Sequence, residues 1–517
     1  MKRLLIWLCA FCSILMPELY AKDDCCCKVS SHTTFVVMPQ YQTGTPERIT
    51  GFRNRIGVRE DGCAGALEVV PIGGKTLKSS ELAKFFTPFC KNKLSVSNNF
   101  KRDHPDLLSE HFNIYPEDLA TQVPGVFNSN ICMKVSQAVA GVGLTYRQGF
   151  WELPCSNSLL WFELAGPIIH VRNKVSLSEE LSSDNTTLLN DGLPQNMIEA
   201  FKQQSWCYGK IDDCRSMHKT RLANLEIKFG YQWLKNDCCF FESFAGIIAP
   251  TGNRPTGHYL FEPIVGFGKH FGGEVGMTGV FQFWECCNSD IVFSFALDMN
   301  AWYFAQHIER RSFDLKDRPW SRYMQTYVSK DQAQQAADLA ATDPTEALIL
   351  STPGINVFTK DMCVNPRMAK IVNSALVITG CHAEGEIGYN FFTRQAECVK
   401  LASCWKEGPA LKDINQGAGY TNNLQTINRW TISPEVGDTQ PLPVASYDLN
   451  LIKECDLDLE SAAHPGFITH TFYGSFMWRW DELKFPCFVG LGGSFEYCDD
   501  NTYLTRWLGW AKVGFSF

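Results

Sequence analysis

The chain has 517 residues, of which 45% are hydrophobic and 13% aromatic, and its formal net charge is −8. This mild acidity and the lack of a basic stripe give no support to nucleic-acid binding. Beyond the amino terminus the sequence contains no run of about 18 apolar residues, which excludes a helical membrane protein. The length would fit two or three soluble domains, or one transmembrane β-barrel in which only every second strand residue faces lipid.

The first 21 residues have the pattern of a secretory signal peptide. Lys2 and Arg3 precede an apolar run from Leu4 to Met16, and a cleavage site follows Ala21. The apolar run is too short to span a bilayer. We therefore expect residues 1–21 to be removed and the rest of the chain to be exported.

Residues 22–130 carry the weakest pattern in the chain. We expect strands at Thr34–Gln40 and Ala66–Ile72 and a short helix at Ser80–Phe86. This amino-terminal region could supply the first strands of a barrel or a small plug, and the pattern does not favour either.

From residue 131 onward, apolar and polar side chains alternate in segment after segment. In the clearest one, Ala223–Trp233, one parity carries Phe229 and the other carries Glu226 and Lys228. Successive side chains of a strand point to opposite faces, so this alternation predicts strands with one apolar face. The predicted strands are 138–151, 159–175, 223–233, 239–249, 259–269, 274–285, 291–303, 368–379, 383–393, 468–480, 487–497 and 503–517.

The length of these strands distinguishes a barrel from a β-sandwich, which would bury the same apolar faces. Runs of about 11–14 residues exceed the roughly five or six of soluble strands and suffice to cross a bilayer at a tilt. Lipid cannot pair exposed backbone groups, so such strands must close on themselves. The sequence therefore predicts an all-β fold, a transmembrane antiparallel β-barrel over residues 131–517 with about 12–14 strands, or 16 at the upper limit, and long polar loops.

Two helices are expected in the long connections. One is an Ala- and Gln-rich helix at Lys330–Thr342, capped by Ser329, within the connection 305–367. The other is a short amphipathic helix at Pro194–Gln204.

The last strand ends the chain on an aromatic residue. In Thr505–Phe517 (TRWLGWAKVGFSF), alternate positions counted back from Phe517 are apolar or small, and no polar tail follows. This ending resembles that of bacterial outer-membrane β-barrel proteins of the Gram-negative, porin-like type, without indicating a specific family. The resemblance implies location in the bacterial outer membrane and recognition of the last strand by the barrel-assembly machinery. The residues of this assembly signal are Trp507, Val513, Phe515 and Phe517.

In such barrels the carboxyl terminus lies on the periplasmic side. Counting strands back from it puts the long connections 305–367 and 395–466 outside the cell. The same count puts the long connection 176–221 in the periplasm, where connections tend to be short.

Residues on the polar parity are expected to line a water-filled lumen. His382, Glu384 and Glu386 would point the same way about 6–7 Å apart, which fits a lumen wall better than a metal or acid–base site. The lumen-lining set is Glu226, Lys228, Glu242, Glu262, Glu274, Asp298, Asn300, His382, Glu384, Glu386, Arg479, Glu496 and Lys512. Its excess of carboxylates predicts a mild preference for cations or neutral solutes over anions.

The chain is cysteine-rich, with 20 of its 22 cysteines in the exported part. In an oxidising compartment we expect disulfides that tie loops and strand ends together. Such cysteines flank short turns or lie in long connections, as Cys238, Cys239, Cys286, Cys287, Cys207, Cys214, Cys398 and Cys404 do. No Cys/His set has zinc-ligand spacing, and HExxH, GxSxG, EF-hand and GxGxxG patterns are absent, so we expect no metal, cofactor or enzymatic activity.

The leading hypothesis is a porin-like outer-membrane channel for passive passage of small hydrophilic solutes, since about 12–14 strands leave room for a lumen. The alternative is a structural envelope barrel without an open pore, disulfide-linked to itself or to neighbours. An outer-membrane enzyme is a third hypothesis, without a convergent set of catalytic residues to support it. The expected partners are outer-membrane lipid, the barrel-assembly machinery and small solutes, with a homo-oligomer or disulfide-linked neighbours as a further option.

Overall fold

The computed structural model describes most of the chain. The expected signal peptide at 1–21 and the three consecutive cysteines at 25–27 lie outside the described residues. The described ranges are 32–37, 40–53, 64–98, 105–116, 125–153, 158–189, 192–236, 238–286, 291–340, 342, 346, 349–412, 451–498 and 503–517.

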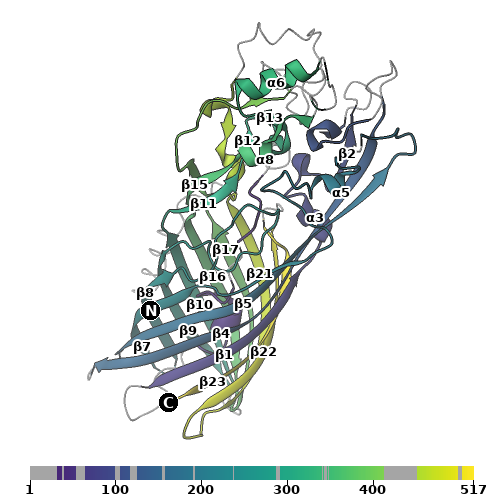
Figure 1. The fold of residues 1–517 in the computed structure, drawn as a ribbon. Coiled ribbons are helices and arrows are strands. Elements are labelled where there is room, and N and C mark those ends of the chain that lie inside the picture. The colour runs from purple at the N-terminus through teal and green to yellow at the C-terminus, as the bar shows by residue number, and fades with distance from the viewer. Residues whose placement is uncertain are drawn as a thin grey trace.

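Twelve strands within the described residues form a closed antiparallel barrel (Figure 1). Each barrel strand pairs with the next one along the chain, and the first pairs with the last, for example at Leu67 and Phe515. The predicted all-β transmembrane barrel is thereby confirmed. Its strands are β1 (Gly65–Thr76), β4 (Asn128–Leu153), β5 (Ser158–Leu181), β7 (Leu225–Lys235), β8 (Cys239–Ala249), β9 (Gly272–Glu285), β10 (Val292–Phe304), β16 (Arg367–Thr379), β17 (Ala383–Arg394), β21 (Phe467–Trp480), β22 (Cys487–Cys498) and β23 (Arg506–Ser516).

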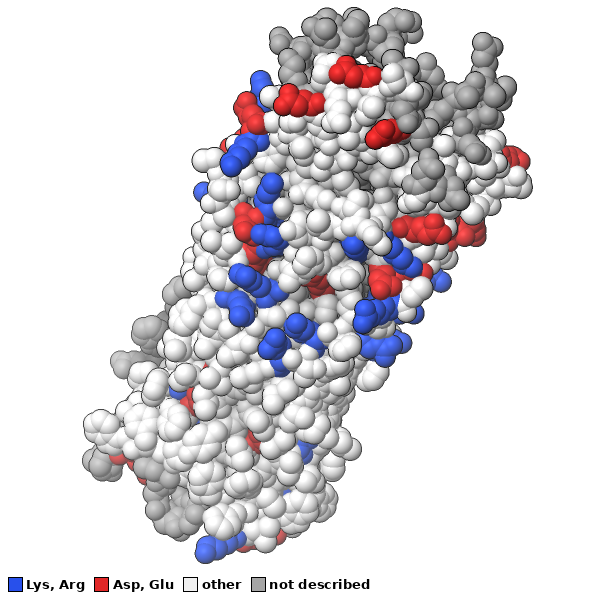
Figure 2. All heavy atoms as spheres, in the orientation of Figure 1, with Lys and Arg blue, Asp and Glu red and all other residues white. Residues whose placement is uncertain are grey.

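The outer face of the barrel is apolar and the inner face is polar. Outward side chains such as Phe229, Ile387 and Leu491 are 62%, 70% and 68% exposed, whereas Lys228 and Glu386, one residue away, are buried. Figure 2 shows the lower wall almost free of charged side chains. An exposed apolar wall of this size in a closed barrel is what a lipid environment requires. Among the described residues, no helix is long and apolar enough to cross a bilayer.

The terminal residue lies where β23 closes against β1. The Phe517 amide donates to the Gly65 carbonyl at 2.9 Å, and its ring stacks on Tyr146 with the centroids 6.2 Å apart. Trp507, Val513 and Phe515 point outward from β23 and are 41–47% exposed. Their role as an assembly signal together with Phe517 stays a prediction.

Short turns join the strands at one end of the barrel, and long connections join them at the other. The connection from β5 to β7 lies at the same end as the connections 305–366 and 395–466 (Figure 1). The prediction that 176–221 lies on the opposite side of the membrane from these two connections is therefore wrong. The error has one cause, which is that the predicted strand 259–269 does not exist. One extra strand in the count moves every earlier connection to the opposite end of the barrel. The alternating apolar residues of that segment, Phe261 and Phe267 among them, are buried in the core of the long-connection end.

The long connections fold into a separate layer above the barrel, here called the head, which also includes the upper parts of β4 and β5 (Figure 1). Its apolar core contains stacked aromatic rings such as Trp206 and Tyr323, with centroids 5.1 Å apart. Its strands are β2 (Lys93–Ser97), β3 (Leu107–Leu108), β6 (Met217–Leu222), β11 (His307–Ser312), β12 (Asp314–Leu315), β13 (Gln325–Tyr327), β14 (Thr352–Pro353), β15 (Thr359–Asn365), β18 (Cys398–Leu401), β19 (Ala410–Leu411) and β20 (Leu457–Asp458). Its helices are α3 (Ser79–Ala83), α5 (Met197–Ala200), α6 (Lys330–Ala340), α8 (Gly354–Val357), and the 3₁₀ turns η1 (Pro88–Cys90), η2 (Ser109–Phe112), η3 (Ser321–Tyr323), η6 (Glu454–Asp456) and η7 (Leu459–Ala462).

The two helices expected in the long connections differ in how well the structure matches them. The helix α6 is present, and Ser329 caps it by accepting a hydrogen bond from the Gln332 amide at 3.2 Å. The helix predicted over 194–204 is present only as the shorter α5. It begins after Asn196, whose side chain caps the helix by accepting a hydrogen bond from the Glu199 amide.

The amino-terminal region supplies both a barrel strand and a segment inside the barrel. β1 lies in the wall, as expected for 66–72, whereas the predicted strand 34–40 is wrong: residues 32–37 are irregular and pack into the head. Residues 40–53, here called the lumenal segment, lie within the barrel and include the single-turn helix α2 (Pro46–Ile49). The chain thus runs from the head into the lumen before β1 begins at the short-turn end.

Candidate functional site

The lumenal segment touches the barrel wall through backbone positions that need glycine. Gly44 and Gly51 have φ values of +86° and +66°, which L side chains rarely adopt. A Cβ atom at Gly51 would lie 1.8 Å from the Met477 sulfur, and one at Gly44 would lie 2.7 Å from the Ile371 side chain. Every residue of the segment except Ile49 is buried, so it occludes the barrel at this level.

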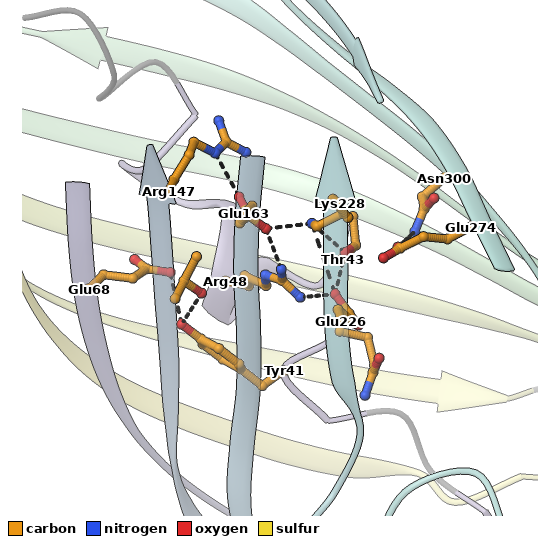
Figure 3. A network of polar contacts seen from close by, with 12 residues as sticks. Tyr41, Thr43, Arg48, Glu68, Arg147, Glu163, Glu226, Lys228, Glu274 and Asn300 are labelled. Carbon is orange, nitrogen blue, oxygen red and sulfur yellow. Dashed lines mark hydrogen bonds and ion pairs between the residues drawn. The ribbon is translucent and has the colours of Figure 1, made fainter. Parts of the chain in front are cut away.

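Arg48, on α2, forms the first ionic contact with the wall (Figure 3). One terminal nitrogen lies 2.5 Å from a Glu163 carboxylate oxygen, and the other pairs with Glu226. Lys228 lies 2.5 Å from the same Glu163 oxygen, and Thr43 of the segment donates to Glu226 at 2.7 Å. The cluster therefore links the segment to the neighbouring strands β5 and β7.

Arg53 forms the second ionic contact, on the opposite part of the wall. Its two terminal nitrogens bind both oxygens of Glu386 at 2.7 and 2.8 Å, and its Nε lies 2.9 Å from Asp298. Tyr473 donates to Glu386 at 2.7 Å, and Asn373 donates to Asp298 at 3.0 Å. A fork-shaped guanidinium between two carboxylates fixes geometry as well as charge.

Three further wall residues bind the segment without using its charged groups. Lys512 on β23 donates to the Thr50 carbonyl at 2.7 Å and also faces Glu68 at 3.3 Å. The Tyr41 hydroxyl donates to Glu68 at 2.9 Å, and Asn390 donates to the Gly44 carbonyl at 3.0 Å. The segment is thus held on several sides of the barrel.

Most of the residues predicted to line the lumen lie on the inner wall. The Arg479 side chain pairs with Glu384 at 3.0 Å, and Glu496 accepts from Thr469 at 3.0 Å. The inward residues of the predicted set, all on barrel strands, are Glu226, Lys228, Glu242, Glu274, Asp298, Asn300, Glu384, Glu386, Arg479, Glu496 and Lys512.

Two predicted lumen residues lie elsewhere. Glu262 belongs to the connection between β8 and β9 and accepts hydrogen bonds from the Thr256 hydroxyl and the Tyr259 amide, because 259–269 is not a strand. His382 lies in the turn before β17, where its 44% exposed side chain is 3.6 Å from Glu482. The alternation that carries Glu384 inward does not extend to this turn.

Sequence reasoning missed the residues that complete the lumen. Glu163 on β5 and Arg147 on β4 pair at 2.6 Å, and Arg147 also reaches Glu242 at 3.1 Å. Both residues occupy inward positions of predicted strands. A charged residue at such a position could therefore have been assigned to the lumen from the sequence alone. Arg48 and Arg53 had no such signal, because no strand pattern surrounds them.

The charges of this part of the lumen nearly balance. Seven buried wall carboxylates face five buried cations, and a cavity of about 40 Å³ remains beside the segment. That volume has room for only a few water molecules. The wall carboxylates are Glu68, Glu163, Glu226, Glu242, Glu274, Asp298 and Glu386, and the cations are Arg48, Arg53, Arg147, Lys228 and Lys512. The segment itself adds one buried carboxylate, Glu47, which accepts a hydrogen bond from the Tyr41 amide.

A second buried ionic cluster holds the start of the described chain in the head. Arg311 on β11 pairs with Glu309 at 2.6 Å and with Glu397 at 3.1 Å, and it donates to the Thr33 hydroxyl at 3.0 Å. Its guanidinium also lies over the Phe35 ring, 4.3 Å from the centroid. The residues just before the lumenal segment are therefore anchored by this cluster.

The cluster also sets two unusual pKa values. Burial alone would raise the pKa of Glu397, but Arg311 and Arg394 outweigh it and lower the pKa to about 2. Burial lowers the pKa of His464 to about 3, with a further contribution from Arg394. At neutral pH Glu397 is therefore ionised and His464 is neutral.

The cysteines in the described part of the chain do not form the expected loop disulfides. Cys207, Cys214, Cys398 and Cys404 are exposed free thiols. Cys214 lies in a surface group with Asp212 and Asp213 that has metal-ligand proximity, but Lys202 already pairs with Asp213.

Comparisons with known proteins find similarity only among solved structures. No family model and no curated protein matches the chain. An outer-membrane channel of Pseudomonas putida F1 is similar over 88% of this chain and 95% of that chain, at 7% identity and a TM-score of 0.35. The β domain of the Bordetella autotransporter BrkA is similar over 87% and 98%, at 7% identity and a TM-score of 0.28. A Pseudomonas aeruginosa FadL homologue is similar over 88% and 90%, at 7% identity and a TM-score of 0.24.

We predict that Arg53→Met strongly destabilises the folded barrel, because it leaves Asp298 and Glu386 buried without their cation. The expected loss is about 3–5 kcal/mol in the free energy of unfolding, measured by urea titration of the protein refolded in vesicles. Arg310→Met is the matched control, since the Arg310–Asp361 pair is 39% and 53% exposed, and about 0–1 kcal/mol is expected there. Equal losses in the two variants would contradict the assignment of Arg53 to a buried ionic contact.

We also predict that the head loses stability on acidification. The folded-state pKa values of Glu397 and His464 lie below their ordinary values of 4.5 and 6.5, so the unfolded head binds these protons first. Their contribution is complete above about pH 6.5 and falls as the pH drops toward about 2–3. The protection factors of the amides of residues 33–35, which correct for the intrinsic pH dependence of exchange, should fall over this range.

The variant His464→Phe tests this prediction further. It removes the histidine titration from a site already packed against Phe85 and Phe467, so the loss between about pH 6.5 and 4.5 should shrink. Protection factors in the wild type that stayed the same between pH 7 and pH 4 would contradict the prediction.

Proposed function

We propose that the protein is a bacterial outer-membrane channel for small hydrophilic solutes, closed by its own lumenal segment. The observation that carries this proposal is the chemistry of the barrel interior. The wall carries charged side chains such as Glu163, Lys228 and Glu386, and the space between them is filled by a peptide segment. A barrel that served only as an anchor could fill its interior with wall side chains, as small barrels do.

The contacts that hold the segment favour a reversible closure. They consist mainly of ion pairs and hydrogen bonds at Tyr41, Arg48, Thr50 and Arg53. Water can replace such contacts at low cost when the segment moves, because each group regains hydration. The vacated lumen would then be hydrophilic on all sides.

The open lumen would favour cations. Displacing the segment removes Arg48, Arg53 and Glu47, so the seven wall carboxylates would face only Arg147, Lys228 and Lys512. Uncompensated carboxylates in a narrow low-dielectric passage attract cations and repel anions. The mild cation preference expected from the sequence thus becomes a property of the opened state.

This proposal gives the chain no catalytic role and no cofactor. Its partners would be small hydrophilic solutes in the lumen, outer-membrane lipid around the wall and the barrel-assembly machinery during insertion. The long-connection end, with the head, would face outward, as long loops do in such barrels.

Planar-bilayer recordings test the proposal. We expect the wild type to conduct rarely and the double variant Arg48→Met/Arg53→Met to conduct far more often, because both ionic contacts of the segment are lost. Arg310→Met should behave as the wild type. The reversal potential of the double variant in a salt gradient should indicate cation preference.

Several outcomes would count against the channel. If the double variant stays silent although heat-modifiable migration shows a folded barrel, the channel proposal fails. A clear anion preference would instead refute the assignment of the lumen charges.

A structural role is the second candidate, and the exposed thiols of the head favour it. Cys207, Cys214, Cys398 and Cys404 are exposed, and none of them is bonded to another described cysteine. Under this alternative they would link the barrel to copies of itself or to neighbours in an oxidising compartment. Non-reducing electrophoresis of membranes prepared with thiols blocked would show linked species that collapse on reduction, and a monomer alone would exclude the role.

A further inference from the structure

A group of cations lies on the outer face of the barrel, just above the apolar wall. Lys75 on β1, Lys134 on β4, and Arg172 and Lys174 on β5 share the outward parity of their strands; all four, here called the basic patch, are exposed or half-exposed. Figure 2 shows Lys and Arg side chains gathered above the uncharged lower wall.

The strand register brings these cations together. Lys75 is opposite Ala138, and Ala138 is opposite Arg172, so one small residue separates the two cations across three strands. Strands are about 4.8 Å apart, so the Cα atoms of Lys75 and Arg172 lie roughly 10 Å apart and both side chains can reach one small anion between them. Lys174 and Lys134 lie in the adjoining rows, opposite Ser136 and Ser176.

No carboxylate neutralises the patch. Among the described residues, none of the four cations takes part in an ion pair. The carboxylates farther along β5 have other partners: Glu180 pairs with Lys93 at 3.1 Å, and Glu179 accepts from the Met197 amide at 2.9 Å. The patch is therefore a site of unbalanced positive charge on a protein whose net charge is negative.

The position of the patch identifies its partner. Four residues along β5 from Arg172, about 14 Å, the outward residue is Ile168, 51% exposed and paired with Val142 and Leu222 in an apolar row. On the other side, Lys75 is directly opposite Trp507, a residue type that favours the membrane interface. Lipid tails that cover Ile168 must place their headgroups at the level of the cations.

We infer that the basic patch binds the phosphate groups of anionic lipids in the leaflet at the long-connection end of the barrel. An arginine fork and two or three ammonium groups suit a phosphate whose charge no amine of the same lipid balances. The small residues Gly73, Ala138 and Ala140 leave room for the headgroup between the long side chains. This inference is independent of whether the lumen opens.

Native mass spectrometry of the full-length, detergent-released protein with added lipid tests the inference. Wild-type protein should retain phosphatidylglycerol in preference to phosphatidylcholine, and the preference should weaken with salt. Lys75→Ser/Arg172→Ser should reduce phosphatidylglycerol retention by about fivefold for each cation removed. Lys400→Ser/Lys406→Ser, which removes the same charge from exposed sites in the head, should leave it unchanged.

Three results would overturn the inference. The first is equal retention of the two lipids by the wild type, and the second is an unchanged preference in Lys75→Ser/Arg172→Ser. The third is binding of inorganic phosphate by the wild type without any lipid preference, which would make the patch a solute site. Heat-modifiable migration of each variant excludes misfolding as the cause of a loss.

Discussion

A β-sheet surrounded by hydrocarbon cannot leave a strand edge unpaired, and the rest of this structure depends on that constraint. The constraint forces β1 to pair with β23 and so fixes where β1 begins, at the short-turn end. Residues 32–37, however, pack into the head at the other end. The chain must therefore cross the length of the barrel between them, and a polar backbone can do so only through the lumen. Occlusion by residues 40–53 is a consequence of this connectivity.

The lumenal segment and the charged wall depend on each other. Glu163 and Glu386 are almost fully buried, and a buried carboxylate without a partner is costly enough to destabilise the barrel. Arg48 and Arg53 face the same problem, because the segment that carries them has no contact with bulk water. Pairing the two sets of charges lowers the cost of burying each of them. The directional guanidinium contacts also fix the position of the segment. A hydrophobic segment of the same length would fill the space but leave the carboxylates unmatched.

The sequence predicts the wall well because the wall is periodic. Alternation in Ala223–Trp233 is a local property, and the structure places Phe229 outside and Lys228 inside as that alternation requires. The strand prediction failed at 259–269, where Phe261 and Phe267 are buried, together with Leu260 and Ile264, in a head that has no strand period. Apolar periodicity indicates that one side of a segment is removed from water. It does not indicate whether lipid or protein covers that side.

The interior could be predicted only in part. Inward acids such as Glu226 and Asp298 follow from parity, but their partners do not, since 245 residues separate Arg53 from Asp298 and 333 separate it from Glu386. Pairings over such distances arise only once the barrel is closed. The expected disulfides could not be predicted for the same reason. Cysteine content can suggest an oxidising compartment, but it does not indicate which thiols lie close enough to bond.

Movement of the lumenal segment is mechanically linked to the head. Only two residues separate position 37, packed in the head, from position 40, where the segment begins, so a shift of the segment by more than about 10 Å pulls on residues 32–37. On the other side, ten residues join position 53 to position 64, and they can span up to about 35 Å when extended. The longer connecting stretch therefore lies toward β1, and the anchor lies in the head, where Arg311 contacts Thr33 and Phe35. Any displacement that clears the lumen must either stretch the chain against this anchor or release it. In the proposed opening, the buried Arg311–Glu397 pair would therefore oppose displacement of the segment, although it lies in the head, outside the membrane-spanning wall.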